Sequence, residues 1–244
     1  MLASSNGLTL PGWRDFERAV ATTFVGEAQE NKYVFDVVVP LSATSTIKYG
    51  VSCKMRRELN RVLKRDGRVT MELSNSAKQF WRYLLTYGIN ETNYRNNANE
   101  VGKRIIELVN SWHELASINV SKLDLGRSSY LVLSWNSKGQ YQLHQFSLEL
   151  PDPTRLRWYF PVKMTKEGEK PADRLCGAHE NGVIFEWYGQ SGGQLKYYPL
   201  ASNAIWASHI FQLEPLPSLE NMRYGILAKT QTYFPTQWQK VAEL

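Results

Sequence analysis

NKYVFDVVVP (residues 31–40) and TIKYGVSCKM (residues 46–55) are the two stretches that decide the fold of this chain. The first is rich in β-branched and aromatic residues and stops at Pro40, which predicts a buried strand. The second alternates in polarity, which predicts a strand with one apolar face and one mixed face. The apolar face would carry Ile47, Tyr49, Val51, Cys53 and Met55, and the other Lys48, Gly50, Ser52 and Lys54.

A helix is predicted just before these strands, over residues 10–25. Pro11 suits the first helical position, and apolar side chains recur at helical spacing from Trp13 to Phe24. Further along we expect a basic helical segment after residue 55, a short strand over 68–73, helices over 74–87 and about 100–116, and a β-rich region after residue 128 with a hairpin turn at Gly192-Gly193. This order favours an α/β or α+β protein with a β-rich second half.

Three charged residues break the local patterns. Glu17 lies four residues after Trp13 and three before Val20, on the apolar face of its helix. Asp36 stands inside an apolar strand, where burying an unpaired charge costs roughly several kcal/mol of folding free energy. Lys54 ends the next strand. Each has an ordinary explanation: a glutamate that reaches water, a structural ion pair and a solvated lysine.

Taken together, Glu17, Asp36 and Ser52-Cys53-Lys54 resemble the PD-(D/E)XK nuclease core of many type II restriction endonucleases. The resemblance covers about residues 10–88. It implies an α/β fold with a restriction-endonuclease-like α-β-β-β-α-β core, in which the acid and the lysine lie at the splayed ends of neighbouring strands. The rest of the chain would be a β-rich C-terminal elaboration.

The chain departs from this family pattern at two positions. Phe35 replaces the proline, and Ser52 replaces the acid two residues before the lysine. In one branch of the family the motif is SXK and the second acid comes from the following helix. Glu72, at the start of the predicted helix over 74–87, is the residue expected to fill that role, with Asp66 as the alternative.

The resemblance implies hydrolysis of phosphodiester bonds. Asp36 and Glu72 would bind Mg²⁺, with Glu17 contributing through a water, because carboxylates and retained waters are the ligands that Mg²⁺ prefers. Lys54 would contact the scissile phosphate or the attacking water. The four histidines show no metal-ligand spacing and are expected at the surface or in hydrogen bonds.

Charge and composition limit the other possibilities. There are 29 Lys and Arg against 23 Asp and Glu, a net charge of +6, and basic residues gather between residues 54 and 68. This distribution favours a polyanionic partner, here double-stranded DNA. Two cysteines exclude a disulfide scaffold, and no apolar run is long enough for a membrane span, so we expect a cytoplasmic protein that does not bind membranes. The expected DNA contacts are Arg56, Arg57, Asn75, Lys78 and Gln79.

The sequence-based hypothesis is therefore a type II restriction endonuclease. A catalytic core would span residues 8–124, and residues 125–244 would recognise DNA or form a homodimer, since a two-fold dimer cuts both strands of a palindrome most simply. Two alternatives stay open: a structure-specific repair or junction-resolving nuclease of the same fold, and a non-catalytic DNA-binding protein in which Ser52 marks a decayed site.

Overall fold

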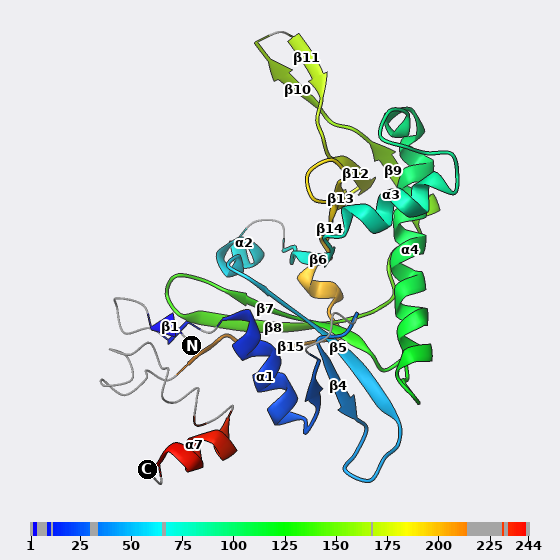
Figure 1. The fold of residues 1–244 in the computed structure, drawn as a ribbon. Helices are drawn as coiled ribbons and strands as arrows, with labels where there is room; N and C mark the ends of the chain where they lie inside the picture. The colour runs from blue at the N-terminus through cyan, green and yellow to red at the C-terminus, as the bar shows by residue number, and fades with distance from the viewer. Residues whose placement is uncertain are drawn as a thin grey trace.

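The computed structural model describes residues 2–3, 9–10, 12–29, 34–64, 67–166, 168–213, 231 and 234–242. Within this part the protein is a mixed α/β structure built on two large sheets (Figure 1). Its helices are α1 (Trp13–Thr23), α2 (Leu59–Lys64), α3 (Ala77–Leu85), α4 (Ala98–Asn119) and α7 (Pro235–Ala242), with short 3₁₀ helices η1 (Tyr94–Asn97), η2 (Pro153–Arg155) and η3 (Ala201–Asn203).

The first large sheet has the strand order β15-β8-β7-β5-β4-β3, with β16 also pairing with β8. Its strands are β3 (Glu27–Ala28), β4 (Val37–Pro40), β5 (Lys48–Arg56), β7 (Ser129–Trp135), β8 (Gln140–Ser147), β15 (Trp206–Ala207) and β16 (Phe211–Gln212). Neighbours are antiparallel except β5 and β7, which are parallel. A parallel pair needs a long crossover connection, and here α4 leads back to β7.

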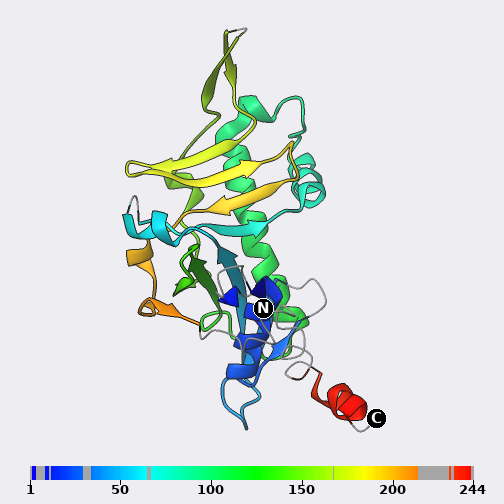
Figure 2. The same cartoon turned by 90° about the vertical axis from the view of Figure 1, so that its left-hand side faces the viewer.

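The second large sheet is antiparallel, with the order β6-β14-β13-β12-β9. Its strands are β6 (Met71–Ser74), β9 (Arg157–Tyr159), β12 (Leu175–His179), β13 (Gly182–Tyr188) and β14 (Gln194–Tyr197). Two ribbons complete the strands: β1 (Leu2–Ala3) with β2 (Thr9–Leu10), and β10 (Val162–Thr165) with β11 (Gly168–Pro171). The β10–β11 hairpin projects from the rest of the protein (Figures 1 and 2).

Two hydrophobic clusters hold these layers together. The smaller packs Phe16 and Val20 of α1 against Val37, Val51 and Cys53 of the first sheet. The larger joins α3 and α4 to the second sheet and to the opposite face of the first. The long helix α4 runs alongside both sheets, which are stacked one above the other in Figure 2. One helix thus contributes to the core of both halves.

Most of the expected elements are confirmed, including the α/β class. Helix α1, strand β5 and helices α3 and α4 fall within a few residues of their expected ranges, and Gly192 and Gly193 adopt the left-handed conformation in the β13–β14 turn. The strand expected over 31–40 begins only at Val37 among the described residues, so Asp36 precedes β4 instead of lying within it. Its carboxylate bonds to the backbone of β5 at this point.

The expected division between residues 124 and 125 does not separate the two sheets. Strands β7 and β8 follow that division yet pair with β5 in the first sheet. Strand β6 precedes it yet pairs with β14 in the second sheet. Within the described part of the chain, none of the helices combines the length and apolarity needed to cross a lipid bilayer.

A close approach between α4 and β9 generates the first testable prediction. Gly102 lies on the buried side of α4, where an added Cβ would overlap the indole of Trp158. Gly102→Ala should therefore lower the free energy of unfolding by about 1–3 kcal/mol through overpacking, although alanine ordinarily stabilises a helix relative to glycine. Urea denaturation would measure this, with exposed Asn110→Ala on the same helix as the control, expected within about 0.5 kcal/mol of the parent. Stabilisation by Gly102→Ala would contradict the packing.

Candidate functional site

The Asp36 carboxylate lies at the point where β4 begins and organises the neighbouring residues of β5. Its Oδ2 accepts a hydrogen bond of 2.7 Å from the Cys53 amide and one of 3.3 Å from the Ser52 hydroxyl. The Lys54 ammonium lies 3.6 Å from the same oxygen. Among the described residues, Oδ1 accepts no hydrogen bond. Asp36 is therefore fixed through Oδ2, and Oδ1 is available to a ligand.

Lys54 and Ser52 share the face of β5 that is turned toward α4. The Lys54 side chain is 21% exposed, so most of it is covered by the protein. Beneath this face lies His113 of α4, which shares a hydrogen bond of 3.0 Å with the hydroxyl of Tyr130. Burial, with a smaller effect from the Lys54 charge, lowers the pKa of His113 to about 4. The imidazole is therefore neutral at pH 7.

Glu17 approaches the same place from α1. Glu17 is only 7% exposed, and no described residue donates a hydrogen bond to its carboxylate. Burial and then the negative charge of Asp36 raise the pKa of Glu17 to about 7, while Arg14, Lys54 and Arg18 act in the opposite direction. The spacing of Glu17 from Val20 predicted this inward placement, whereas Trp13, which was expected on the same apolar face, is 58% exposed. Arg14 stands at the i−3 spacing that brings helical neighbours together.

Cys53 lies between Ser52 and Lys54 in the chain, but its thiol belongs to the opposite, α1-facing side of β5. It is a free, buried cysteine. Burial, followed by the charges of Asp36 and Glu17, raises the pKa of this thiol. Its backbone amide binds Asp36, so the residue takes part in the site through its main chain.

Glu72 belongs to a different group of residues. It lies on β6 and pairs with Lys196 of β14 in the second sheet, not at the start of a helix beside Asp36. Its Oε2 receives hydrogen bonds of 2.6 Å from Arg56 and 2.6 Å from Gln194. No described contact joins Glu72 to Glu17 or Asp36. Asp66, the alternative acid, lies outside the described residues.

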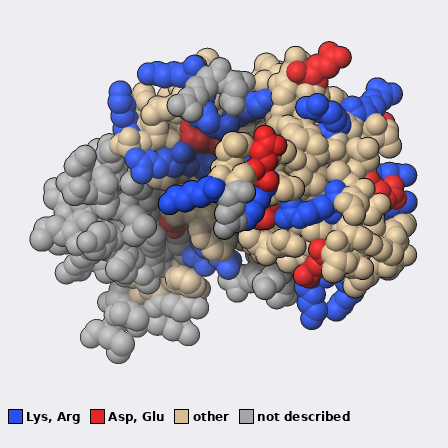
Figure 3. All heavy atoms as spheres, turned by 90° about the horizontal axis from the view of Figure 1, so that it is seen from above, with Lys and Arg blue, Asp and Glu red and all other residues tan. Residues whose placement is uncertain are grey.

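The remaining expected DNA contacts are Arg57, which follows β5, and three residues around the start of α3. The guanidinium of Arg57 is 5.6 Å from the ring centre of Trp135, a cation–π contact that the sequence did not reveal. Asn75, Lys78 and Gln79 are exposed around the start of α3. The face shown in Figure 3 carries many Lys and Arg side chains and fewer Asp and Glu. This surface suits a polyanion.

Two carboxylates at this site fit a hard divalent cation. Asp36 has one oxygen without a partner and Glu17 has a carboxylate without one, among the described residues, and their mutual repulsion would be relieved by a positive ion. No group of three or more His, Cys, Asp or Glu side chains gathers at any described place. Mg²⁺ is commonly bound through one or two carboxylates with several waters, so two carboxylates are a ligand number that this ion accepts.

The raised pKa of Glu17 predicts a pH-dependent stability. Between pH 4.5 and about 7 the folded protein binds a proton that the unfolded chain has lost, so this group's contribution decreases as the pH rises. In metal-free buffer, the free energy of unfolding of Glu17→Gln should rise relative to that of the parent between pH 5 and pH 8. The rise should be on the order of 1–3 kcal/mol, and urea titrations at each pH would measure it.

The control is Glu114→Gln, which removes an exposed carboxylate from α4. Its difference from the parent should be independent of pH over the same range. If Glu17→Gln behaves like this control, the Glu17 carboxylate is not held in the environment described.

The site combines two carboxylates with a lysine that lies within ion-pair distance of one of them. This arrangement suits the binding and polarisation of a phosphate ester. Comparisons with family models, with curated proteins and with solved structures gave no match to this chain.

Proposed function

We propose that this protein is a Mg²⁺-dependent DNA endonuclease that hydrolyses phosphodiester bonds. The observation that carries the proposal is the grouping of Glu17 of α1, Asp36 just before β4 and Lys54 of β5. Acid, acid and lysine in this order are the residues expected of a PD-(D/E)XK nuclease.

The order of the elements supports the proposal. Helix α1 is followed by the antiparallel strands β3, β4 and β5, then by α4 and by β7, which lies parallel to β5. This order is compatible with the α-β-β-β-α-β core that the sequence resemblance implies. Under this proposal helix α2, strand β6 and helix α3 would be an insertion between β5 and α4, and Glu72 would belong to that insertion.

Each side chain of the site has a role that follows from its contacts. The Asp36 Oδ1 and the Glu17 carboxylate would hold Mg²⁺, which, when bound, lowers the pKa of a coordinated water and neutralises charge on the leaving oxygen. Lys54, held near Asp36, would contact a non-bridging oxygen of the scissile phosphate. With its pKa raised to about 7, Glu17 is only partly ionised near neutral pH in the free protein and would lose its remaining proton to solvent when a cation binds.

Ser52 takes the position at which the family carries an acid. Its hydroxyl donates to Asp36 Oδ2, the oxygen that also receives the Cys53 amide. Ser52 would therefore orient Asp36 and leave Oδ1 directed away from β5. We assign it as a positioning residue, and Glu17 supplies the second carboxylate.

The proposal includes sequence-specific, type II restriction cleavage of double-stranded DNA. The second sheet and the projecting β10–β11 hairpin (Figure 1) lie outside the α-β-β-β-α-β succession and offer a region for recognition. A two-stranded β-ribbon is one of the elements that fit the major groove. A structure-specific repair nuclease would use the same catalytic residues but cut without regard to sequence.

Cleavage of unmethylated phage DNA tests the activity. The parent with Mg²⁺ should yield discrete bands, and EDTA should abolish them. Asp36→Asn and Lys54→Ala should each lower the cleavage rate by about 100-fold or more, because each removes a charge that acts on the reacting phosphate or its metal. Binding of DNA, measured by fluorescence anisotropy, should persist in both variants.

Lys48→Ala is the matched control, since Lys48 lies on the same strand and the same face as Lys54. It should cut like the parent. A Mg²⁺-dependent smear would favour the repair nuclease, and an absence of cleavage on several DNAs would contradict the proposal and favour a binding protein.

We further propose that the protein is a homodimer, because two active sites related by a two-fold axis match the symmetry of a palindromic site. Light scattering during size-exclusion chromatography should give about twice the 28.1 kDa mass of the chain. A monomeric mass, with and without a DNA duplex, would contradict this part of the proposal.

A further inference from the structure

A cavity of about 740 Å³ lies at the junction of the two large sheets. Glu17, Asp36, Ser52 and Lys54 are not among the described residues that line it. Three separate connections between the sheets contribute to its wall. Arg68 comes from the segment between α2 and β6, Arg155 from the connection of β8 to β9, and Asn203 from the connection of β14 to β15. Its volume lies in the range of small-molecule sites.

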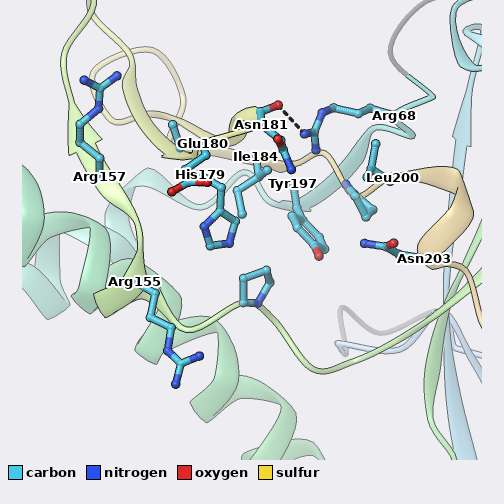
Figure 4. A pocket seen from close by; sticks show the side chains of 13 residues that line it. Arg68, Arg155, Arg157, His179, Glu180, Asn181, Ile184, Tyr197, Leu200 and Asn203 are labelled. Atoms are coloured by element: carbon cyan, nitrogen blue, oxygen red, sulfur yellow. Dashed lines mark hydrogen bonds between the residues drawn. The ribbon is translucent and has the colours of Figure 1, made fainter.

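Polar groups converge inside this cavity (Figure 4). The His179 ring, the Tyr197 hydroxyl and the Asn203 amide point into it. Among the described residues, none of these three side chains has a hydrogen-bond partner. The Tyr197 ring is held in place by stacking on Phe185, with ring centres 4.7 Å apart. The cavity therefore offers aromatic surfaces together with hydrogen-bonding groups that are available to a ligand.

Positive charge surrounds the same cavity. Arg68 is 9% exposed and forms one wall, where it donates to the carbonyl oxygens of Tyr198, at 2.7 Å, and Asn181, at 3.0 Å. Arg155 and Arg157 are exposed and stand along the opposite rim (Figure 4). Among the described residues that line the cavity, Glu180 is the one carboxylate. Arg155 also lies 3.5 Å from a carboxylate oxygen of Asp152, which is not part of the lining. Three arginines against two acids leave the mouth of the cavity with a net attraction for anions.

We propose that this cavity binds a nucleotide, with its ring system inside and its phosphate at the arginine rim. Tyr197, His179 and Asn203 would contact the base and sugar, since these groups combine flat surfaces with donors and acceptors. Arg155 and Arg157 would turn inward to the phosphate, which guanidinium groups bind in a bidentate manner. The nucleotide is either a free molecule or one unpaired unit of a nucleic acid chain.

Isothermal titration calorimetry in EDTA tests this site independently of metal-dependent cleavage. The probes are deoxyadenosine 5′-monophosphate, deoxyadenosine, inorganic phosphate and a 12-nucleotide single strand. We expect the monophosphate to bind one site, about tenfold or more tightly than deoxyadenosine or phosphate alone. The double variant Arg155→Ala/Arg157→Ala should lose about tenfold in affinity for the monophosphate, and Tyr197→Phe should weaken both the monophosphate and deoxyadenosine.

The matched control removes two exposed arginines elsewhere, Arg82→Ala/Arg127→Ala, and should leave affinity within about twofold of the parent. If the single strand binds but the monophosphate does not, and if the affinity for the single strand falls in the Arg155→Ala/Arg157→Ala variant, the ligand is a unit of a nucleic acid chain. The proposal is overturned if neither the monophosphate nor the single strand binds. It is also overturned if inorganic phosphate binds as tightly as the monophosphate, or if the two double variants lose the same affinity for the monophosphate. Because cleavage is measured separately, failure of one proposal leaves the other intact.

Discussion

Strand β5 must pair with two different neighbours along its nine residues, and the rest of the structure depends on this constraint. Its first half, Lys48 to Val51, is antiparallel to β4, and its second half, from Val51 onward, is parallel to β7. A parallel neighbour cannot follow through a tight turn, so the chain must travel to the other end of the sheet and return. The helix that returns, α4, supplies the packing surface that both sheets share.

The same division of β5 creates the site. Where β4 begins, the Asp36 side chain accepts the Cys53 amide, so a carboxylate is fixed beside the strand that carries Lys54. Glu17, from the helix that covers the other face, adds a second carboxylate whose pKa is raised to about 7 chiefly by burial and then by Asp36. Burial and the charge of Asp36 disfavour the ionised form of Glu17 in the free protein, and under the proposed function a bound cation would offset that cost.

How much of the fold and of the site was predictable depended on how far apart in the sequence the interacting residues lie. Alternation over residues 46–55 identified β5, and the spacing from Val20 placed Glu17 on an inward face, because both signals are local. Trp13, expected on the same face, is exposed. The place of Glu72 was not predictable: it is decided by Gln194, 122 residues away, and by Arg56. The sequence suggested that Glu72 begins a helix beside the site, but β6 pairs with β14, and no local pattern encodes that partner.

The burial of Cys53 bears on how the protein responds to oxidants. A cysteine within two residues of the acid–lysine cluster invites the expectation of a redox-sensitive centre, yet burial, with a smaller effect from the charges of Asp36 and Glu17, disfavours its thiolate. Reactivity toward peroxide and alkylating agents belongs to the thiolate, so this position is chemically quiet. The centre can keep its geometry without a reducing environment, because Cys53 contributes an amide rather than sulfur chemistry.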